Sequence, residues 1–262
     1  MRTLRALRAF RSWRETVAGR RAERALARQL AYQHDKARRK PDDDAALTVG
    51  LEGYAALVLA RIRDVAPLAA DARTLEIGCG AHGLVFFAGL PNGVGVDPLA
   101  SAYRRLFPRW QSRAATVQAV GEALPFADGT FDLVLSDNVV DHAHDPARIL
   151  AEVARVLRPG GLLYFTVNVH HRFWRAVAEL HALWNALGLH VEIGPFADHT
   201  THLTADDARR LVTRQPFTIV REALPIAETR TAARLTPLRH PGDLAKRLFF
   251  KNVRYEIIAK RR

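Results

Sequence analysis

Cysteine and methionine are scarce in this 262-residue chain, which contains one of each. The single cysteine, Cys79, excludes an intrachain disulfide framework, so a reducing, cytoplasmic location is expected. No apolar run approaches the roughly 18 residues of a membrane-spanning helix, and arginines interrupt the N-terminus too often for a signal peptide. Because 48% of the residues are hydrophobic, the chain is predicted to form one globular domain with a sizeable core.

Lysine is also rare, and arginine supplies almost all of the basic charge behind the formal net charge of +12. Such a balance can indicate a polyanionic partner or an anionic membrane surface. It can equally reflect a general preference for arginine codons, because the charge is spread along the chain. Charge alone therefore leaves nucleic-acid binding open without favouring it.

Residues 1–44 are predicted to be a basic, helical N-terminal extension. Apolar residues recur at helical spacing between the arginines, at Leu4, Leu7, Phe10, Trp13 and Val17. The pattern resembles an interfacial amphipathic helix, and residues 1–20 could contact a membrane surface. Arg11 and Arg14 interrupt the apolar side, however, so a helix docked on the protein's own core is the alternative.

The remaining residues, 45–262, alternate between predicted helices and strands. A helix is expected from Ala45 to Val65. Apolar runs that predict strands follow at residues 73–77, 93–96, 115–119, 131–136, 162–167, 217–223 and 255–259. Asp145 and Pro146 mark the start of a helix between the fourth and fifth strands, which Pro159-Gly160-Gly161 is expected to end. Strands separated by helices predict a doubly wound, Rossmann-like α/β fold.

A glycine-rich loop follows the first strand. Residues 75–83 read LEIGCGAHG, so Gly78, Gly80 and Gly83 satisfy the pattern G-x-G-x-x-G. Glycines let the backbone turn sharply near a ligand, and a following helix would present free N–H groups to an anion. Asp97 ends the second strand, where an acid meets ribose hydroxyls in dinucleotide-binding folds. The loop alone could serve NAD, S-adenosylmethionine or an ordinary tight turn.

Glu76, two residues before the first glycine, helps to distinguish between NAD and S-adenosylmethionine as the ligand of this loop. Loops that bind nicotinamide cofactors usually carry a neutral residue there. An acid could receive the α-ammonium group of a methionine moiety, directly or through water, or could merely accept hydrogen bonds from loop amides. We favour the first interpretation, which indicates S-adenosylmethionine as the cofactor.

The stretch from Gly121 to Asn168 carries a more specific pattern. It contains LPF at 124–126, FD at 131–132, DH at 141–142, DP at 145–146 and RVLRPGG at 155–161. With the glycine loop, these motifs resemble the class I S-adenosylmethionine-dependent methyltransferases over residues 70–170, in particular the ubiquinone/menaquinone methyltransferase-like (type 11) small-molecule group. The resemblance implies a seven-stranded sheet whose last strand is antiparallel. It also implies methyl transfer to a small molecule such as a natural product, lipid or sugar.

The resemblance also implies roles for single residues. The methionine part of S-adenosylmethionine would lie against Gly78, Cys79 and Gly80, and the ribose against Asp97 and Pro98. Gly121 and Glu122 would flank the adenine, and Asp137 would lie beside the transferring methyl group.

Two positions depart from the family pattern. His82 stands where the third glycine is expected, and Val120 stands where an acid often contacts the adenine amino group. Packing by Leu99 and Phe126 is then expected to help recognise adenine. Neither departure affects Glu76, so the cofactor prediction stands.

Methyl transfer to a hydroxyl group benefits from a general base. His142, just after the fourth strand, is the candidate, with Asp141 or Asp137 orienting it; a structural histidine that caps the next helix is the alternative. These three residues, with His144 and Asp145, could also ligate a divalent metal. Asp145 is better explained as a helix cap, so no metal is predicted.

Residues 169–203 are predicted to form a helical lid over the acceptor. They are rich in histidine and aromatic residues: His170, His171, Phe173, Trp174, His181, Trp184, His190, Phe196, His199 and His202. Aromatic residues would suit an apolar or ring-bearing acceptor, although the lid could instead pack around its own core.

Other functions compete with this interpretation. A macromolecule-directed methyltransferase could grip nucleic acid with the basic N-terminus and with Lys260-Arg261-Arg262. A nicotinamide-dependent oxidoreductase rests only on the glycine spacing. A non-catalytic scaffold could keep the fold and attach to a membrane through residues 1–20.

Overall fold

The computed structural model describes residues 26–39, 42–177, 203–235 and 248–262. Residues 26–39 are helical, and the division of the chain at residue 44 stays a prediction. The predicted amphipathic segment at residues 1–20 and residues 178–202 of the predicted lid lie outside the described residues.

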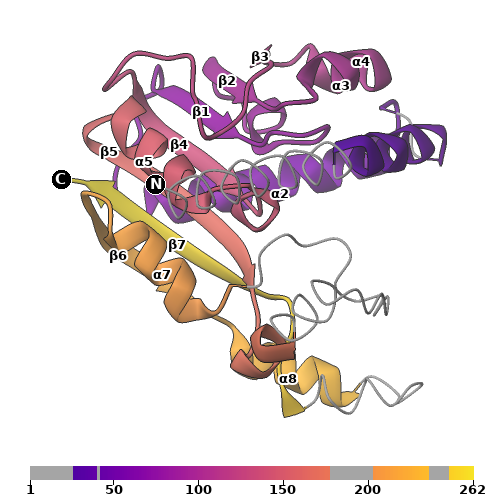
Figure 1. Ribbon diagram of the computed structural model, residues 1–262. Coiled ribbons are helices and arrows are strands. Elements are labelled where there is room, and N and C mark those ends of the chain that lie inside the picture. The colour runs from indigo at the N-terminus through magenta and orange to yellow at the C-terminus, as the bar shows by residue number, and fades with distance from the viewer. Residues whose placement is uncertain (1–25, 40–41, 178–202, 236–247) are drawn as a thin grey trace, which may run out of the picture.

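Seven strands form a single sheet in the order β3-β2-β1-β4-β5-β7-β6 (Figure 1). The strands are β1 (Arg73–Ile77), β2 (Asn92–Val96), β3 (Ala115–Val117), β4 (Phe131–Asp137), β5 (Leu157–Val169), β6 (Phe217–Ala223) and β7 (Val253–Arg261). The first five strands are parallel. The last strand, β7, runs antiparallel between β5 and β6, which confirms the predicted fold class.

Helices cover both faces of the sheet and divide the core into two layers. They are α2 (Ala45–Arg63), α3 (Ala100–Leu106), α4 (Pro108–Gln111), α5 (Pro146–Val156), α7 (Ala205–Thr213) and α8 (Ile226–Leu235), with 3-10 turns η1 (Leu84–Phe86) and η2 (Val140–His142). Val134 and Leu163 pack with α5 and α7 on one face. Leu133 and Leu162 pack with α2 and η1 on the other. The alternation follows from the two-residue period of a strand.

Within the described residues, α2 alone is long and apolar enough to cross a membrane. This corrects the expectation that no apolar run reaches that length, because the helix is built mainly from alanine, glycine and aliphatic residues. Length and composition alone are weak evidence, since a core helix passes the same test. Val58, Leu59 and Ile62 of α2 are buried against the sheet.

The boundary between α5 and β5 differs from the sequence prediction. Asp145 caps α5 and Pro146 is its first residue, as predicted. The helix ends at Val156, however, and Pro159-Gly160-Gly161 lies inside β5 rather than after a helix. Gly160 has a φ of 80°, and the pairing of β5 with β4 shifts register at this point. The glycine therefore accommodates an irregularity in the strand.

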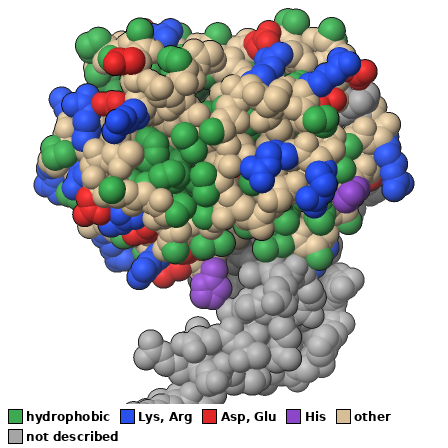
Figure 2. Space-filling model, turned by 90° about the horizontal axis from the view of Figure 1, so that it is seen from above, with side chains coloured by type: hydrophobic (Ala, Val, Ile, Leu, Met, Phe, Trp, Pro, Cys, Tyr) green, Lys and Arg blue, Asp and Glu red, His purple; other side chains and the backbone are tan. Residues whose placement is uncertain are grey.

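Basic side chains do not form one continuous track on the face that carries β2, β3, α3 and α4. Figure 2 views this face from above and shows Lys and Arg scattered among acidic and uncharged side chains, with hydrophobic side chains gathered in one patch. Proteins that bind nucleic acid usually concentrate their basic residues in a patch or stripe. This face agrees better with charge that is spread along the chain.

Candidate cofactor and acceptor site

The carboxyl ends of β1, β2 and β4 lie side by side. Ile77 pairs with Val96 of β2, both at the last positions of their strands, and with Ser136, one residue before the end of β4. The glycine loop, Asp97 and Asp137 follow directly and therefore meet at one edge of the sheet. Doubly wound α/β folds bind their ligands at this edge.

The glycine loop turns through two residues with positive φ, Gly78 at 64° and Gly80 at 53°. A Cβ at Gly78 would come within 2.6 Å of Val139, so this glycine permits close packing against the loop after β4. A Cβ at Gly80 would meet nothing nearer than a carbonyl oxygen at 3.9 Å. The space beside Gly80 is therefore open to a ligand.

Asp97 borders this space. Its carboxylate accepts hydrogen bonds from the amide nitrogens of Gly80, at 3.0 Å, and Leu99, at 2.7 Å. Burial raises the pKa of Asp97, while the two amides favour its charged form. Each oxygen keeps a further lone pair. An acid held this way beside an open glycine fits the ribose diol of S-adenosylmethionine.

Glu76 lies beneath the loop and is 2% exposed. Its oxygens accept hydrogen bonds from the amides of Leu84, at 3.0 Å, and Val85, at 2.8 Å. Burial raises the pKa of Glu76 to about 8. In this structure the side chain supports η1, which is the alternative considered from the sequence. Contact with an α-ammonium group stays a prediction.

The expected helix after the glycine loop is absent from the described structure. Only the three-residue turn η1 follows, because residues 84–91 are too few for an α-helical crossover before β2. The amides of Leu84 and Val85 are used by Glu76. The prediction that a helix N-terminus here offers free N–H groups to an anion is therefore wrong.

Cys79 turns its side chain away from the open space. The residue is buried, and a Cβ on Gly95 of β2 would lie 2.6 Å from its sulfur. Burial raises the pKa of the thiol. Only the backbone of Cys79 is suitably placed to border a ligand, and the neighbouring Pro98 lies in the turn after β2.

His82, the first departure from the family pattern, packs into an aromatic cluster. Its ring centroid lies 5.1 Å from that of Phe107 and 5.0 Å from that of Trp110. Gln111 donates hydrogen bonds to the carbonyls of Gly80 and Ala81. Helix α4 thus holds the loop from its outer side, a contact that no sequence motif indicated.

The loop after β3 is held by α5. Arg155 donates hydrogen bonds to the carbonyls of Leu124 and Phe126, at 3.0 and 2.7 Å, and pairs with Glu152. The carboxylate of Glu122 accepts from the amides of His144 and Asp145. This carboxylate therefore joins two loops of the site rather than pointing freely toward a ligand.

Two further residues of this loop bear on the predicted adenine contact. A Cβ at Gly121 would lie 3.0 Å from Ile77 and 3.1 Å from Ile149, so only glycine packs here without displacement. Val120 is 47% exposed. Position 120 therefore offers no polar side chain to the adenine amino group, which the family often contacts with an acid at this position.

Asp137 lies at the end of β4 in a polar cluster that the sequence analysis missed. It accepts hydrogen bonds from Tyr54, at 3.1 Å, and from Thr166, and it pairs with the guanidinium group of Arg254. Arg254 also lies over the Tyr54 ring, 5.0 Å from its centroid. Burial and the charge of Asp137 raise the pKa of Tyr54 to about 12.

A second layer of polar groups lies behind this cluster. Tyr164 donates a hydrogen bond to Glu256 at 3.1 Å, and Arg61 pairs with the same carboxylate at 2.5 Å. The two layers connect α2, β4, β5 and β7. Asp137 is thereby fixed in position by elements that are distant in the sequence.

His142 lies in η2, and its side chain is 50% exposed. Its Nε2 atom lies 3.9 Å from Oδ2 of Asp141, which is fully buried. Asp145 accepts from the amide of Arg148 and so acts as the helix cap. No three His, Cys, Asp or Glu side chains converge as metal ligands in the part of the chain that the structure describes.

The described part of the predicted lid is aromatic and packs against residues 248–251. Phe173 stacks on Phe249, with 4.3 Å between the ring centroids. Trp174 donates a hydrogen bond to the carbonyl of Phe249, and His171 meets Phe250 edge-on. The histidine and aromatic residues at 181–202 lie outside the described residues.

Comparison with known proteins supplies an independent test. Residues 75–165 match the family model of a methyltransferase domain. The chain is 47% identical over 77 residues to an uncharacterized methyltransferase of Mycolicibacterium gilvum (strain PYR-GCK), covering 29% of this chain and 30% of that protein. It is 31% identical over 165 residues to the malonyl-[acyl-carrier protein] O-methyltransferase of Enterobacter lignolyticus (strain SCF1), covering 62% of each. The chain thus spans less than two thirds of both relatives.

Solved structures show the same fold. The geranyl diphosphate C-methyltransferase of Streptomyces coelicolor, in complex with Mg²⁺, geranyl diphosphate and S-adenosyl-L-homocysteine, superposes with a TM-score of 0.55 over 79% of this chain and 77% of that one, at 14% identity. At this identity the likeness concerns the fold alone. The family match spans the end of β1, all of β2 to β4 and most of β5, and it includes the glycine loop, Asp97 and Asp137. Residues 75–165 are therefore similar to a methyltransferase domain, within a chain that has the fold of solved methyltransferases.

Proposed function

We propose that this chain transfers the methyl group of S-adenosylmethionine to a small-molecule acceptor by in-line displacement. The observation that carries the proposal is the pairing of Asp97 with the amide of Gly80 beside open space at the carboxyl edge of the sheet. When bound, the cofactor supplies a methyl group already activated on a sulfonium sulfur. The chain's own task is to position the acceptor in line with it.

We propose that different residues around the glycine loop contact different parts of the cofactor. Asp97 would receive the ribose hydroxyls, and the backbone from Gly78 to Gly80 would border the methionine part. The loop at Gly121, tied to α5 by Arg155, would border the adenine. Glu76 would keep the glycine loop in shape from below.

His142 is the proposed general base for a hydroxyl acceptor. Its half-exposed ring can meet an acceptor, and the nearby carboxylate of Asp141 would stabilise the imidazolium that forms. Asp137 is already paired with Arg254, so its proposed role is to position groups beside the transferring methyl. Once an acceptor is found, His142→Asn should lower kcat while S-adenosylhomocysteine binding stays unchanged. An unchanged kcat would leave His142 a structural role.

The relatives support a small-molecule acceptor. By their names, one methylates malonyl-[acyl-carrier protein] and another geranyl diphosphate. The alternative, a nucleic-acid-directed enzyme, depends on the N-terminal segment outside the described residues and on the basic residues at 260–262. Of the latter, Arg261 contacts the carbonyl of Leu157 and contributes to the sheet. The small-molecule assignment is therefore preferred.

Calorimetric titration of the full chain with S-adenosylhomocysteine tests the proposal, with NADH as comparator. Binding in the micromolar range without NADH binding is expected. Asp97→Asn should weaken it by at least about tenfold because the ribose hydroxyls lose a charged acceptor. Asp71→Asn, at an exposed position away from the carboxyl edge, is the matched control. Binding of NADH, or equal affinities of the two variants, would contradict the proposal.

A further inference from the structure

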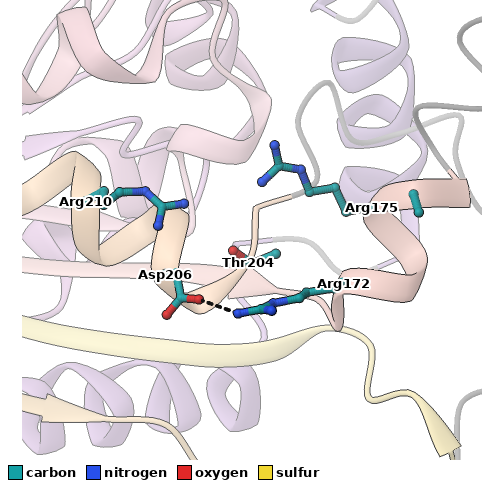
Figure 3. A pocket seen from close by; sticks show the side chains of 6 residues that line it. Arg172, Arg175, Thr204, Asp206 and Arg210 are labelled. Atoms are coloured by element: carbon teal, nitrogen blue, oxygen red, sulfur yellow. Dashed lines mark hydrogen bonds and ion pairs between the residues drawn. The ribbon is translucent and has the colours of Figure 1, made fainter.

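A pocket of about 360 Å³ opens between the segment that follows β5 and the start of α7 (Figure 3). Its lining consists of Arg172, Arg175, Ala176, Thr204, Asp206 and Arg210. In Figure 3 the guanidinium groups of Arg175 and Arg210 approach the middle of the pocket from opposite sides, on either side of Thr204. Three arginines from two separate segments therefore converge here.

The arginines are arranged by two aspartates of α7. Asp207 pairs with Arg175 at 2.7 Å and with Arg210 at 2.5 Å, and Asp206 pairs with Arg172 at 3.2 Å. Partial burial alone would raise the pKa of Asp207, but hydrogen bonds from Thr204 and the arginines lower it to about 2. Among the described residues of the pocket, three arginines therefore gather around two aspartates, which makes this cluster rich in guanidinium donors.

Asp207 is itself held rigidly, because it forms a reciprocal capping box with Thr204 at the start of α7. Asp207 therefore fixes Arg175 and Arg210 at the pocket wall while their side chains remain about half exposed. A guanidinium group presents a planar fork of donors that matches phosphate oxygens better than a point charge does. The arrangement suits a phosphoryl group.

The pocket lies at the same edge of the sheet as the methyl-transfer site. The amide of His170, directly after β5, donates to the carbonyl of Leu203, directly before Thr204, at 2.9 Å. Thr166, four residues before His170, bonds Asp137. Four residues of extended chain span about 13 Å. An anionic group in the pocket would therefore bind well away from the methylated atom.

We infer that Arg172, Arg175 and Arg210 form a subsite for a phosphoryl group carried by the acceptor, remote from the atom that is methylated. The inference rests on the proposed function and narrows it to phosphorylated, extended acceptors. The phosphoryl group could be a terminal diphosphate or a phosphodiester within a carrier arm. Both offer the same oxygens to the arginines but differ in charge.

Titration of the full chain, saturated with S-adenosylhomocysteine, tests the inference. Inorganic pyrophosphate and pantetheine 4′-phosphate are the two probes, at constant ionic strength with sulfate as comparator. Arg175→Gln and Arg210→Gln should each weaken binding of the preferred probe by about tenfold. Arg209→Gln is the matched control, because Arg209 lies on the same helix but pairs with Glu222. Thermal unfolding of each variant checks that the fold persists.

The outcomes distinguish a failure of the phosphoryl subsite from a failure of the proposed methyltransferase function. Preference for pyrophosphate supports a terminal diphosphate, and preference for the pantetheine ester supports a carrier arm. Binding that Arg209→Gln weakens as much as Arg210→Gln does, or that sulfate matches, overturns the subsite. If S-adenosylhomocysteine binds but neither probe does, the subsite is rejected and the methyltransferase proposal stands. If S-adenosylhomocysteine itself fails to bind, the proposed function is rejected first.

Discussion

His82 shows how a single residue of the glycine loop links stability to pH. Its ring packs between Phe107 and Trp110. Burial, and after it the charge of Lys36, lowers the pKa of His82 to about 4 from its ordinary value of 6.5. The folded chain therefore holds a neutral histidine, whereas the unfolded chain takes up a proton below pH 6.5.

The contribution of His82 is fully present above pH 6.5 and is lost as the pH falls toward 4. We expect this loss to reach about 3 kcal/mol in the free energy of unfolding. His82→Phe keeps the aromatic packing but cannot titrate, so the variant should lose less stability over the same range. Urea unfolding at pH 7, 5.5 and 4 measures the difference. Parallel curves for the two proteins would contradict the assignment.

Substitutions at Gly78 and Gly89 distinguish the cost of a strained backbone conformation from the cost of a steric clash. Both have positive φ, 64° and 61°, but a Cβ would clash with Val139 only at Gly78. Gly89→Ala should cost about 1–2 kcal/mol from its backbone conformation alone. Gly78→Ala should cost more and should also weaken S-adenosylhomocysteine binding. Calorimetry and thermal unfolding of both variants test this, and equal losses would show that the contact with Val139 does not matter.

At the scale of single residues, the sequence predicts the positions of residues that depend on local chain geometry, while their roles in binding stay predictions. Glu76 and Asp97 stand at strand ends beside a glycine loop, and spacing alone places them there. The partners of Asp137 could not be found in this way, because Tyr54 lies 83 residues before it and Arg254 117 residues after it. Such contacts depend on strand order, which no short motif encodes.

Helix α5 positions the loop after β3 through a single side chain. Arg155→Met would remove donors from the carbonyls of Leu124 and Phe126 while keeping much of the side-chain volume. We expect a loss of about 1–2 kcal/mol in stability and weaker S-adenosylhomocysteine binding, because the freed loop borders the proposed adenine site. Arg158→Met is the control, since Arg158 pairs with Asp132 and not with this loop.

Elements with strong local signals were predicted best. The Asp145-Pro146 start of α5 is confirmed because capping and proline geometry act within a few residues. The prediction of a helix after the glycine loop was wrong. The number of residues before β2, and not the glycine motif, determines whether the crossover can contain an α-helix. The extension of β5 through Pro159-Gly160-Gly161 was also missed, because Leu157 already pairs with Phe131 of β4 and a register shift accommodates the residues before Leu162.

The ion pair between Arg61 and Glu256 joins α2 to β7 across 195 residues of sequence. Glu256 is 5% exposed, so Arg61→Met would leave a buried charge without its cation. We expect a loss of about 2 kcal/mol, reduced from a fully buried pair because Arg61 is partly exposed. Adding Glu256→Gln should restore most of it. A double variant no more stable than Arg61→Met, by urea unfolding, would contradict this account.

The architecture of the whole molecule was predictable where the chain alternates regularly between strands and helices. Alternation gave the parallel sheet, and the antiparallel last strand came from the family resemblance. The membrane-like composition of α2 was missed because Glu52 and Arg61 interrupt its apolar residues. Packing against the sheet, rather than hydropathy, explains its place in the fold.

The position of β7 has a consequence for synthesis of the protein. Ribosomes make β5 and β6 first, yet both depend on β7, which lies between them. Until residues 253–261 emerge, the nascent chain leaves one edge of β5 and both edges of β6 unpaired, and these edges could join a neighbouring polypeptide. The second half of the sheet can therefore form only after these residues are translated, and until then the growing chain is most vulnerable to aggregation.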